Sequence, residues 1–295
     1  MSKPRLQKFI RGEASDPLKL QPRDTALLRD VAEYRFLNTE QLVALHEGSP
    51  RNIANRLSSL FRHGYLDRPE VQKAARLATS HFVYSLGRKG VEVLAKDAEE
   101  RDGILRRVRE VKRTSALITH ALMISQFRVC LTLALKNRPD IKLSRWVQGN
   151  DLKVLLQRRG GNSELVPDAF FTLEDKNDLL HFFLEADRGT MTQERFVSKL
   201  RVYWRWWSEK RCEASLGITR FRVLTFTPND TRSNNLCRAA KDADPRKQGS
   251  LMYLFASETK YNIAAPDGDI GISVLERRAM VRSTLVDTAT ETLWL

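Results

Sequence analysis

The sequence predicts an α+β protein with a mainly helical first part and a strand-rich second part. Over residues 22–97, short amphipathic helices are closed by a pair of strand patterns. Over residues 115–256, a long apolar helix is followed by three strand patterns, and helices then alternate with two further strands. A chain of 295 residues is long enough for two modest domains or for one large one.

The composition is that of a globular and strongly basic chain. Hydrophobic residues make up 42% and charged residues 29%, which excludes a mainly disordered protein. The 50 Lys and Arg outnumber the 36 Asp and Glu, and the net charge of +14 favours a polyanionic partner. Cys130, Cys212 and Cys237 are widely spaced, so neither a disulfide framework nor a zinc site is expected.

We expect a cytoplasmic protein with no membrane partner. No apolar run approaches the ~20 residues that a spanning helix needs. The first residues are basic but lack the hydrophobic stretch of a signal peptide.

The first domain, residues 22–97, follows a basic tail of residues 1–21 and begins with two helices. Apolar residues recur at helical spacing over residues 23–35. Asn38 then fits an N-cap, with Gln41 at the third helical position of a capping box. This second helix is expected to end near His46.

A third helix is predicted over residues 50–63. Ser49 is its expected cap, Pro50 suits the first helical position, and Gly64 ends the helix. The spacing turns an apolar stripe inward, formed by Ile53, Leu57, Leu60 and Phe61. The outer face is polar and basic and consists of Arg51, Asn52, Asn55, Arg56, Ser59 and Arg62.

Two strand patterns, residues 65–68 and 81–86, follow and are joined by a basic loop that contains Lys73 and Arg76. Three helices and a hairpin are typical of a winged helix-turn-helix, in which the third helix enters the major groove and the wing contacts the DNA backbone. Arg can bind guanine, Asn can bind adenine, and Ser can donate or accept. We therefore predict that the outer face and the loop bind DNA; the alternative is a winged helix used only for protein docking.

The remaining chain is divided by charge and periodicity. Residues 98–114 are densely charged and are interpreted as a linker. The second domain, residues 115–256, is predicted to contain a helix at 115–136, strands at 141–148, 165–173 and 179–187, a helix at 191–212 capped by Thr190, a strand at 221–227, a helix at 233–243 and a strand at 251–256. Residues 257–295 are interpreted as a C-terminal extension.

Two acidic residues, Asp168 and Glu185, flank the hairpin predicted from the second and third of these strands. The strands are predicted to pair with Leu173 opposite Leu179. This register places Asp168 opposite Leu184, next to Glu185. Both carboxylates are therefore expected at the same end of neighbouring strands.

The spacing leaves two interpretations of these carboxylates open. Asp187 lies one pleat beyond Glu185 on the same face. Clustered carboxylates repel one another, and a cation such as Mg²⁺ is the usual reason to gather them. The cluster is therefore either a metal site with Asp168 and Glu185 as ligands or a set of solvated charges at strand ends.

The order helix, three strands, helix, strand resembles the restriction-endonuclease-like core of the PD-(D/E)XK nuclease superfamily. Pro167-Asp168 resembles its Asp motif, and Glu185-Ala186-Asp187 resembles its Glu-x-Lys motif with Asp187 at the lysine position. The chemistry needs a cation to orient water or to stabilise the pentacovalent phosphate. Lys199 on the following helix is a candidate for that cation. The resemblance implies catalytic roles for Asp168, Glu185, Asp187 and Lys199.

A second set of phrases carries a narrower resemblance. The phrases are residues 23–28 and 36–42, His120-Ala121-Leu122, Pro167-Asp168, residues 183–190 and residues 199–203. Together they resemble the replication-relaxation proteins of bacterial plasmids and integrative elements. The resemblance implies a DNA-handling role in plasmid or mobile-element replication, relaxation or transfer.

Two functions remain open. The first is a DNA-binding protein whose nuclease-like domain is a scaffold; the second is a Mg²⁺-dependent DNA endonuclease targeted by its winged helix. Asp187 at the lysine position and the absence of Asp and Glu from residues 115–136 favour the first. The shared position of Asp168 and Glu185 favours the second. Only the endonuclease would need Mg²⁺ as a cofactor. We favour DNA binding. The expected partners are double-stranded DNA, relaxase or replication proteins, and a second copy of the chain.

Overall fold

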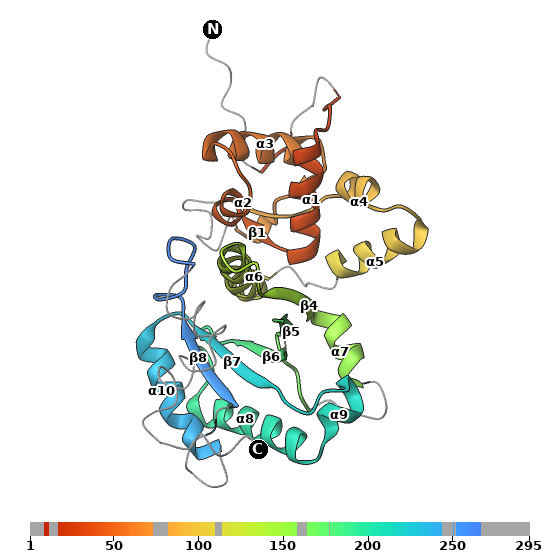
Figure 1. The fold of residues 1–295 in the computed structure, drawn as a ribbon. Helices are drawn as coiled ribbons and strands as arrows, with labels where there is room; N and C mark the ends of the chain where they lie inside the picture. Colours follow the sequence, from red (N-terminus) through yellow and green to blue (C-terminus); the bar gives the residue numbers. More distant parts are fainter. Residues whose placement is uncertain are drawn as a thin grey trace. The chain divides into compact units, whose positions relative to one another are not determined.

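The computed structural model describes residues 9–11, 17–72, 82–109, 114–157, 164–176, 178–243, 250 and 252–266. These residues form a mixture of helices and two sheets, which confirms the predicted α+β class. The chain divides into two compact units, Met1–Val129 and Cys130–Leu295 (Figure 1).

Three helices open the first unit, each within one residue of its predicted bounds. They are α1 (Pro22–Tyr34), α2 (Thr39–Leu45) and α3 (Pro50–Arg62). The capping box of α2 is confirmed: Asn38 Oδ1 accepts from the Gln41 N–H at 2.8 Å, and Gln41 Oε1 accepts from the Asn38 N–H at 2.9 Å. Ser49 is the N-cap residue of α3, although its side chain makes no capping hydrogen bond there.

Gly64 ends α3, as predicted. Its φ of 82° is in the left-handed region that favours glycine. The Gly64 N–H donates to the Phe61 carbonyl at 3.1 Å, and the Tyr65 N–H donates to the Leu60 carbonyl at 3.0 Å. These two bonds form a Schellman motif, which turns the chain from the helix toward the strand that follows.

A small antiparallel sheet completes this part of the unit. Its strands are β1 (Leu37–Asn38), β2 (Leu66–Asp67) and β3 (Val83–Leu86), in the order β1-β3-β2. The predicted strand pair is confirmed, with Leu66 opposite Leu86. Strand β1 was not predicted, because two residues carry no periodicity. Lys73 and Arg76, predicted in the wing loop, lie outside the described residues.

An ion pair connects α3 to α1. Arg56 Nε and Nη2 donate to the two carboxylate oxygens of Asp24 at 2.6 and 2.5 Å, and Nη2 also donates to the Lys19 carbonyl at 2.9 Å. The Asp24 side chain is fully buried. Burial alone would raise the pKa of Asp24, but the hydrogen bonds from Arg56 and from the Gln21 N–H outweigh burial and lower it.

Three further helices follow the sheet. They are α4 (Arg88–Leu94), α5 (Ala98–Arg109) and α6 (Ser115–Lys136). Most of the stretch interpreted as a linker is thus helical, and α6 has its predicted bounds. Within the first unit, Ser125 Oγ donates to the Phe36 carbonyl at 2.7 Å, and Gln41 Nε2 donates to Gln126 Oε1 at 2.9 Å. Residues 115–129 of α6 are therefore an integral part of this unit.

By length and composition, α6 could cross a membrane. This corrects the expectation that no apolar segment approaches the spanning length. The buried core helices of soluble proteins pass the same test, and 39% of the apolar window of α6 is buried.

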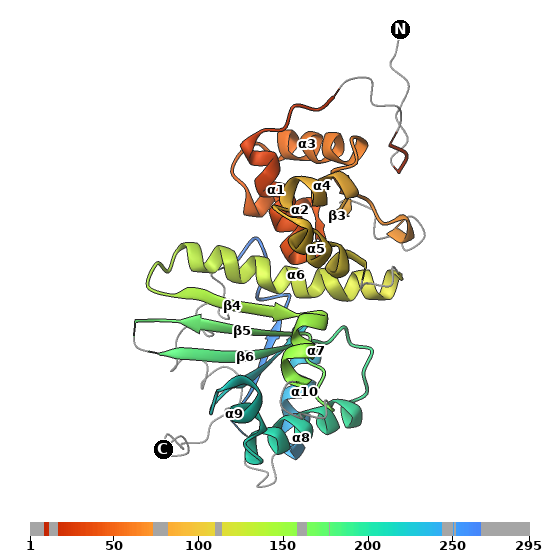
Figure 2. The ribbon, with the colours of Figure 1, turned by 90° about the vertical axis from the view of Figure 1, so that its right-hand side faces the viewer.

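The second unit contains a five-stranded sheet with the order β4-β5-β6-β7-β8 (Figure 1). Figure 2 shows β4, β5 and β6 side by side. Its strands are β4 (Lys142–Gln148), β5 (Ala169–Glu174), β6 (Leu179–Ala186), β7 (Arg222–Thr227) and β8 (Tyr253–Ser257). The strands β4, β5 and β6 are antiparallel, whereas β7 runs parallel to both β6 and β8. All five predicted strands are confirmed, with ends that differ by up to four residues.

The predicted register of the β5–β6 hairpin is wrong by one residue. Leu173 lies opposite Leu180, not Leu179. Continuing the ladder past its last pair places Asp168 opposite Glu185.

The turn explains the difference in register. The Asp175 N–H donates to the Asp178 carbonyl at 3.1 Å, and the Asp178 N–H donates to Asp175 Oδ1 at 2.8 Å. This side-chain bond closes a shorter turn than the hydrophobic pattern implies, so the ladder extends one pair further toward it.

The helices of the second unit are α7 (Gly149–Gln157), α8 (Gln193–Ser208), α9 (Arg211–Leu216) and α10 (Asp230–Ala240). Helix α7 was not predicted, and the prediction of a helix at 191–212 capped by Thr190 is wrong at both ends. Thr192 is the cap, since its side chain accepts from the Arg195 N–H at 3.3 Å. Lys210, with a φ of 54°, separates α8 from α9. The predicted helix at 233–243 begins earlier, at Asp230, with Asn229 as its N-cap.

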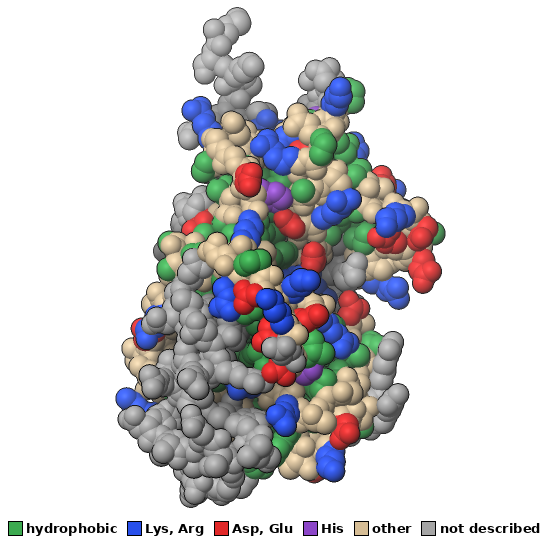
Figure 3. Space-filling model, in the orientation of Figure 1, with side chains coloured by type: hydrophobic (Ala, Val, Ile, Leu, Met, Phe, Trp, Pro, Cys, Tyr) green, Lys and Arg blue, Asp and Glu red, His purple; other side chains and the backbone are tan. Residues whose placement is uncertain are grey.

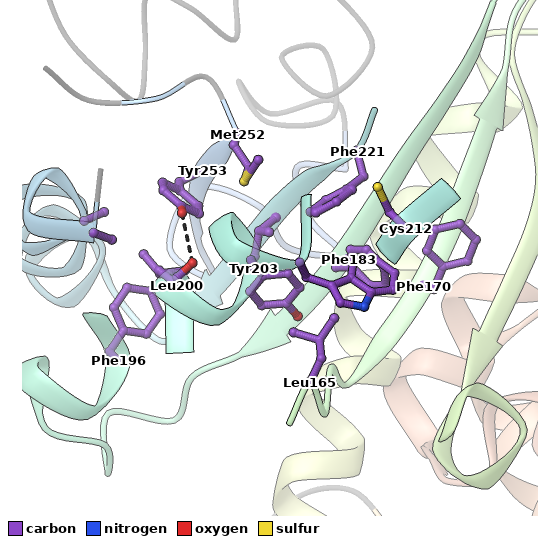
Figure 4. Packing of buried hydrophobic residues seen from close by; sticks show 14 of the residues in the cluster. Leu165, Phe170, Phe183, Phe196, Leu200, Tyr203, Cys212, Phe221, Met252 and Tyr253 are labelled. Atoms are coloured by element: carbon purple, nitrogen blue, oxygen red, sulfur yellow. Dashed lines mark hydrogen bonds between the residues drawn. The ribbon is translucent and has the colours of Figure 1, made fainter. Parts of the chain in front are cut away.

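One buried apolar cluster joins α7, α8, α9 and α10 to a single face of this sheet. At its centre, the Phe183 ring lies 5.1 Å from Phe170, 5.5 Å from Tyr203 and 5.0 Å from Phe221, measured between ring centroids (Figure 4). The Tyr253 hydroxyl donates to the Leu200 carbonyl at 2.9 Å. These contacts fix α8 across β6 and thereby determine which side chains of α8 meet the end of that strand.

The Asp24–Arg56 pair generates a stability prediction. Arg56→Ala leaves the buried Asp24 carboxylate without its cation, so we expect the free energy of unfolding in urea to fall by about 2–3 kcal/mol. The matched control is Arg51→Ala on the exposed face of the same helix, which should change stability by less than about 0.5 kcal/mol. Equal stability of the two variants would contradict a structural role for Arg56.

Candidate functional site

The candidate site is built where β6 ends beneath α8. Glu185 lies two residues after Phe183 on β6, so it faces the same side of the sheet. Lys199 and Tyr203 are four residues apart on α8 and therefore lie one turn apart on one helix face. The packing of Phe183 against Tyr203 brings that face over Glu185.

Both oxygens of the Glu185 carboxylate are hydrogen-bonded to α8. The Tyr203 hydroxyl donates to Oε1 at 2.5 Å, and Lys199 Nζ donates to Oε2 in a salt bridge. Glu185 is only 5% exposed. Burying a carboxylate is unfavourable without such partners, so the Lys-x-x-x-Tyr spacing on α8 provides what the strand residue needs.

Asp168 is held beside Glu185 by the backbone of β6. Its N–H donates to the Leu184 carbonyl at 3.1 Å, and its Oδ2 accepts from the Ala186 N–H at 2.8 Å. Asp168 is half-buried. The structure therefore brings Asp168, Glu185 and Lys199 together, as the sequence predicts, although through a different register.

The surroundings change the proton affinity of Glu185. Burial raises its pKa from the ordinary 4.5 to about 7; the Lys199 charge opposes this rise, and the negative charge of Asp168 adds to it. Burial and the neighbouring Glu185 raise the pKa of Tyr203 well above its usual value. A carboxyl group with a pKa near neutrality can exchange a proton at physiological pH, as general acids and bases do.

Asp187 is held by a different cation. Arg232 donates to its two carboxylate oxygens, through Nε at 2.6 Å and Nη2 at 3.2 Å. The Arg232 Nη2 also donates to the Met191 carbonyl at 2.6 Å. Asp187 thus links the end of β6 to α10, and Lys199 pairs with Glu185 instead. No sequence pattern points to Arg232, because it lies 45 residues from Asp187 on another element.

The carboxylates are few for a metal centre. Within the described parts of the chain, no group of three or more His, Cys, Asp and Glu could hold a metal ion. Asp168 and Glu185 supply oxygen ligands of the kind that Mg²⁺ prefers, and Mg²⁺ is often held by one or two carboxylates plus water and phosphate. A bound cation would compete with Lys199 for Glu185 Oε2. Binding of Mg²⁺ by this pair would therefore require Lys199 to release that oxygen.

The predicted DNA-reading face of α3 is exposed except at Arg56 and Ser59. Arg51, Asn52, Asn55 and Arg62 are all exposed. Ser59 is half-buried, and Arg56 is directed into the Asp24 pair. Figure 3 shows Lys and Arg side chains on the visible face of the first unit, interspersed with other residue types.

The comparisons with known proteins agree with the resemblance predicted from the sequence. A family model described as replication-relaxation matches residues 28–220, which is more than half of the chain. Neither a curated protein nor a solved structure matches.

The raised pKa of Glu185 predicts a characteristic pH dependence of stability. The native state keeps the Glu185 proton up to about pH 7, whereas an unfolded glutamate loses it near pH 4.5. The free energy of unfolding that this proton contributes is therefore fully present below pH 4.5. It is lost as the pH rises to 7, by on the order of 2–3 kcal/mol. Glu185→Gln cannot ionise and should lack this loss. Urea unfolding of both proteins from pH 4 to 8 measures the difference, and parallel curves would rule out the raised pKa.

Proposed function

Because the chain belongs to the replication-relaxation family and acts in replication or relaxation, we propose that it does so as a double-stranded DNA-binding protein of a plasmid or mobile element. The first unit is, on this proposal, a winged helix-turn-helix. The succession of α1, α2 and α3, followed by the β2–β3 pair, supports it. The exposed outer face of α3 is the single observation that carries the proposal.

The chemistry of this face suits base and phosphate contacts. Arg51 and Arg62 can form bidentate hydrogen bonds to guanine or bind phosphate, and Asn52 and Asn55 can bind adenine. Arg56 is excluded from this role in the proposal, because its Nε and Nη2 groups donate to Asp24 and to the Lys19 carbonyl. The net charge of +14 supports a polyanionic ligand.

The cell compartment and partners follow from the same proposal. A plasmid-handling protein would act in the cytoplasm, where its DNA resides. Relaxase or replication proteins and a second copy of the chain are the proposed protein partners.

A second candidate function is a Mg²⁺-dependent DNA endonuclease, and the meeting of Asp168, Glu185 and Lys199 favours it. The change from antiparallel to parallel pairing at β6, with Asp168 and Glu185 on adjacent strands, is compatible with the nuclease-like core expected from the sequence. Asp168 and Glu185 would hold the ion, which would polarise a phosphate and activate water. Lys199 would stabilise the phosphate charge, and Asp187 would act only through its support of the strand end.

The DNA-binding proposal is tested on α3. Arg51→Ala and Arg62→Ala should each weaken duplex binding about 10-fold and lower the salt dependence, because each removes one cation that contacts DNA. Fluorescence anisotropy at several salt concentrations measures both effects. Arg220→Ala removes the same charge from an exposed site in the other unit and should leave the affinity unchanged. Equal loss in all three variants would indicate nonspecific attraction rather than a reading helix.

The endonuclease candidate is tested with supercoiled plasmid. Incubation with Mg²⁺ or Mn²⁺ should produce nicked circles that EDTA prevents, and Asp168→Ala or Glu185→Ala should lower the rate at least about 100-fold. Variants must retain their helical circular dichroism. DNA retention without metal-dependent nicking would leave DNA binding as the function and exclude the endonuclease.

A further inference from the structure

Thr225 carries a buried hydroxyl next to the candidate site. It lies on β7 directly opposite Glu185 in the parallel β6–β7 ladder, so the two side chains are neighbours on one face of the sheet. Thr225 is 1% exposed, and its Oγ1 has no hydrogen-bond partner among the residues that the structure describes. Neither the sequence motifs nor the proposed function assigns it a role.

A buried hydroxyl without a partner destabilises a protein. Valine has almost the same shape and would fill this position without a polar atom to satisfy. The position therefore calls for an explanation, and a role in a neighbouring functional site is one that such groups can have.

The neighbours of Thr225 indicate what that contact is. On the other side of β7, Phe255 lies opposite Thr225 and has no side-chain acceptor. Leu224 and Phe226, its chain neighbours, alternate to the opposite face. The carboxylate of Glu185 is thus the polar group that the ladder places beside the Thr225 hydroxyl.

Glu185 would need a new donor if Lys199 moved. A carboxylate has room for about four hydrogen bonds, and Tyr203 and Lys199 provide one each. The Lys199 side chain is 26% exposed and ends a long flexible stem, so it can turn outward. Its departure would leave Oε2 buried without a donor, because Tyr203 bonds Oε1.

We propose that Thr225 is a positioning residue that donates to Glu185 when Lys199 turns away to bind an anionic phosphate group. The site then has two arrangements. In the first, Lys199 neutralises Glu185 and the Thr225 hydroxyl makes no hydrogen bond. In the second, Lys199 contacts phosphate and the Thr225 hydroxyl donates to the Glu185 carboxylate. The identity of that phosphate as part of DNA rests on the proposed function, whereas the exchange of donors does not.

A double-mutant cycle on thermal stability tests the exchange. Thr225→Val in the otherwise unchanged protein should leave the Tm equal or raise it by about 2 °C, because an idle hydroxyl is removed. In a Lys199→Met background, the same substitution should lower the Tm by about 2 °C or more, because Thr225 is then bonded to Glu185. The same shift in both backgrounds, of either sign, overturns the proposal.

Two controls separate this role from packing. Lys199→Gln retains a donor to Glu185, so Thr225→Val should behave there as in the unchanged protein. Thr225→Ser keeps the hydroxyl, so its Tm shift should be the same in the unchanged and Lys199→Met backgrounds. A sign reversal with Ser as well as Val could not come from loss of the hydroxyl, which Ser retains, and would overturn the proposal.

A second measurement avoids Lys199→Met, should that variant not fold. Inorganic pyrophosphate is titrated by calorimetry into the full chain and into its Thr225→Val and Lys199→Gln variants. We expect a binding component that Lys199→Gln abolishes. Thr225→Val should weaken it by at least about 3-fold, because Glu185 then loses the Thr225 hydrogen bond in the state in which Lys199 has turned away. No Lys199-dependent component, or one that Thr225→Val leaves unchanged, overturns this inference without affecting duplex binding by α3.

Discussion

The second unit depends on one requirement, that the buried carboxylate of Glu185 be neutralised from α8. Glu185 is almost fully buried at the end of β6, so its charge needs both a cation and hydrogen-bond donors. Lys199 and Tyr203 provide them from one face of α8. The aromatic packing around Phe183 brings that face to Glu185, and the polar contact fixes the position of α8 along β6. The contacts that pack the core therefore also position the residues of the site.

The same requirement explains why the acidic residues of the Glu185-Ala186-Asp187 phrase differ in role. Each buried carboxylate has its own cation, Lys199 for Glu185 and Arg232 for Asp187. Arg232 joins the strand end to α10 and to the Met191 carbonyl, which is a structural task. Asp168 is half-buried and accepts a hydrogen bond from the Ala186 N–H. The chemically adaptable part of the cluster is therefore Asp168, Glu185 and Lys199.

In the first unit, Arg56, which the sequence predicts to bind DNA, forms an ion pair with Asp24. Arg56 belongs to the polar stripe of α3 by spacing, but its donors are directed to Asp24 and the Lys19 carbonyl. Spacing alone cannot distinguish such a residue from Arg51 or Arg62, because the partner is on another helix. The pair orients α3 against α1 and leaves its exposed side to Arg51, Asn52, Asn55 and Arg62.

The predictable parts of the structure are those that local chemistry determines. Periodicity and caps located α1, α2, α3 and α6 to within a residue, and the short phrases predicted the family that the model match confirms. The register of the β5–β6 hairpin failed by one residue, because the Asp175–Asp178 turn, not the apolar pattern, sets it. Arg232 and Thr225 could not be found from the sequence, because only the folded sheet brings them to Asp187 and Glu185.

The central claim, that α3 lies against duplex DNA, is tested most directly by site-specific photo-crosslinking. A photoreactive amino acid replaces Asn55 on the exposed face of α3 or, as the control, exposed Glu99 on α5. Irradiation with labelled duplex should give a covalent adduct from position 55 and none from position 99. Adducts at position 99 alone, or equal yields at both positions, would contradict the assignment of α3 as the DNA-reading helix.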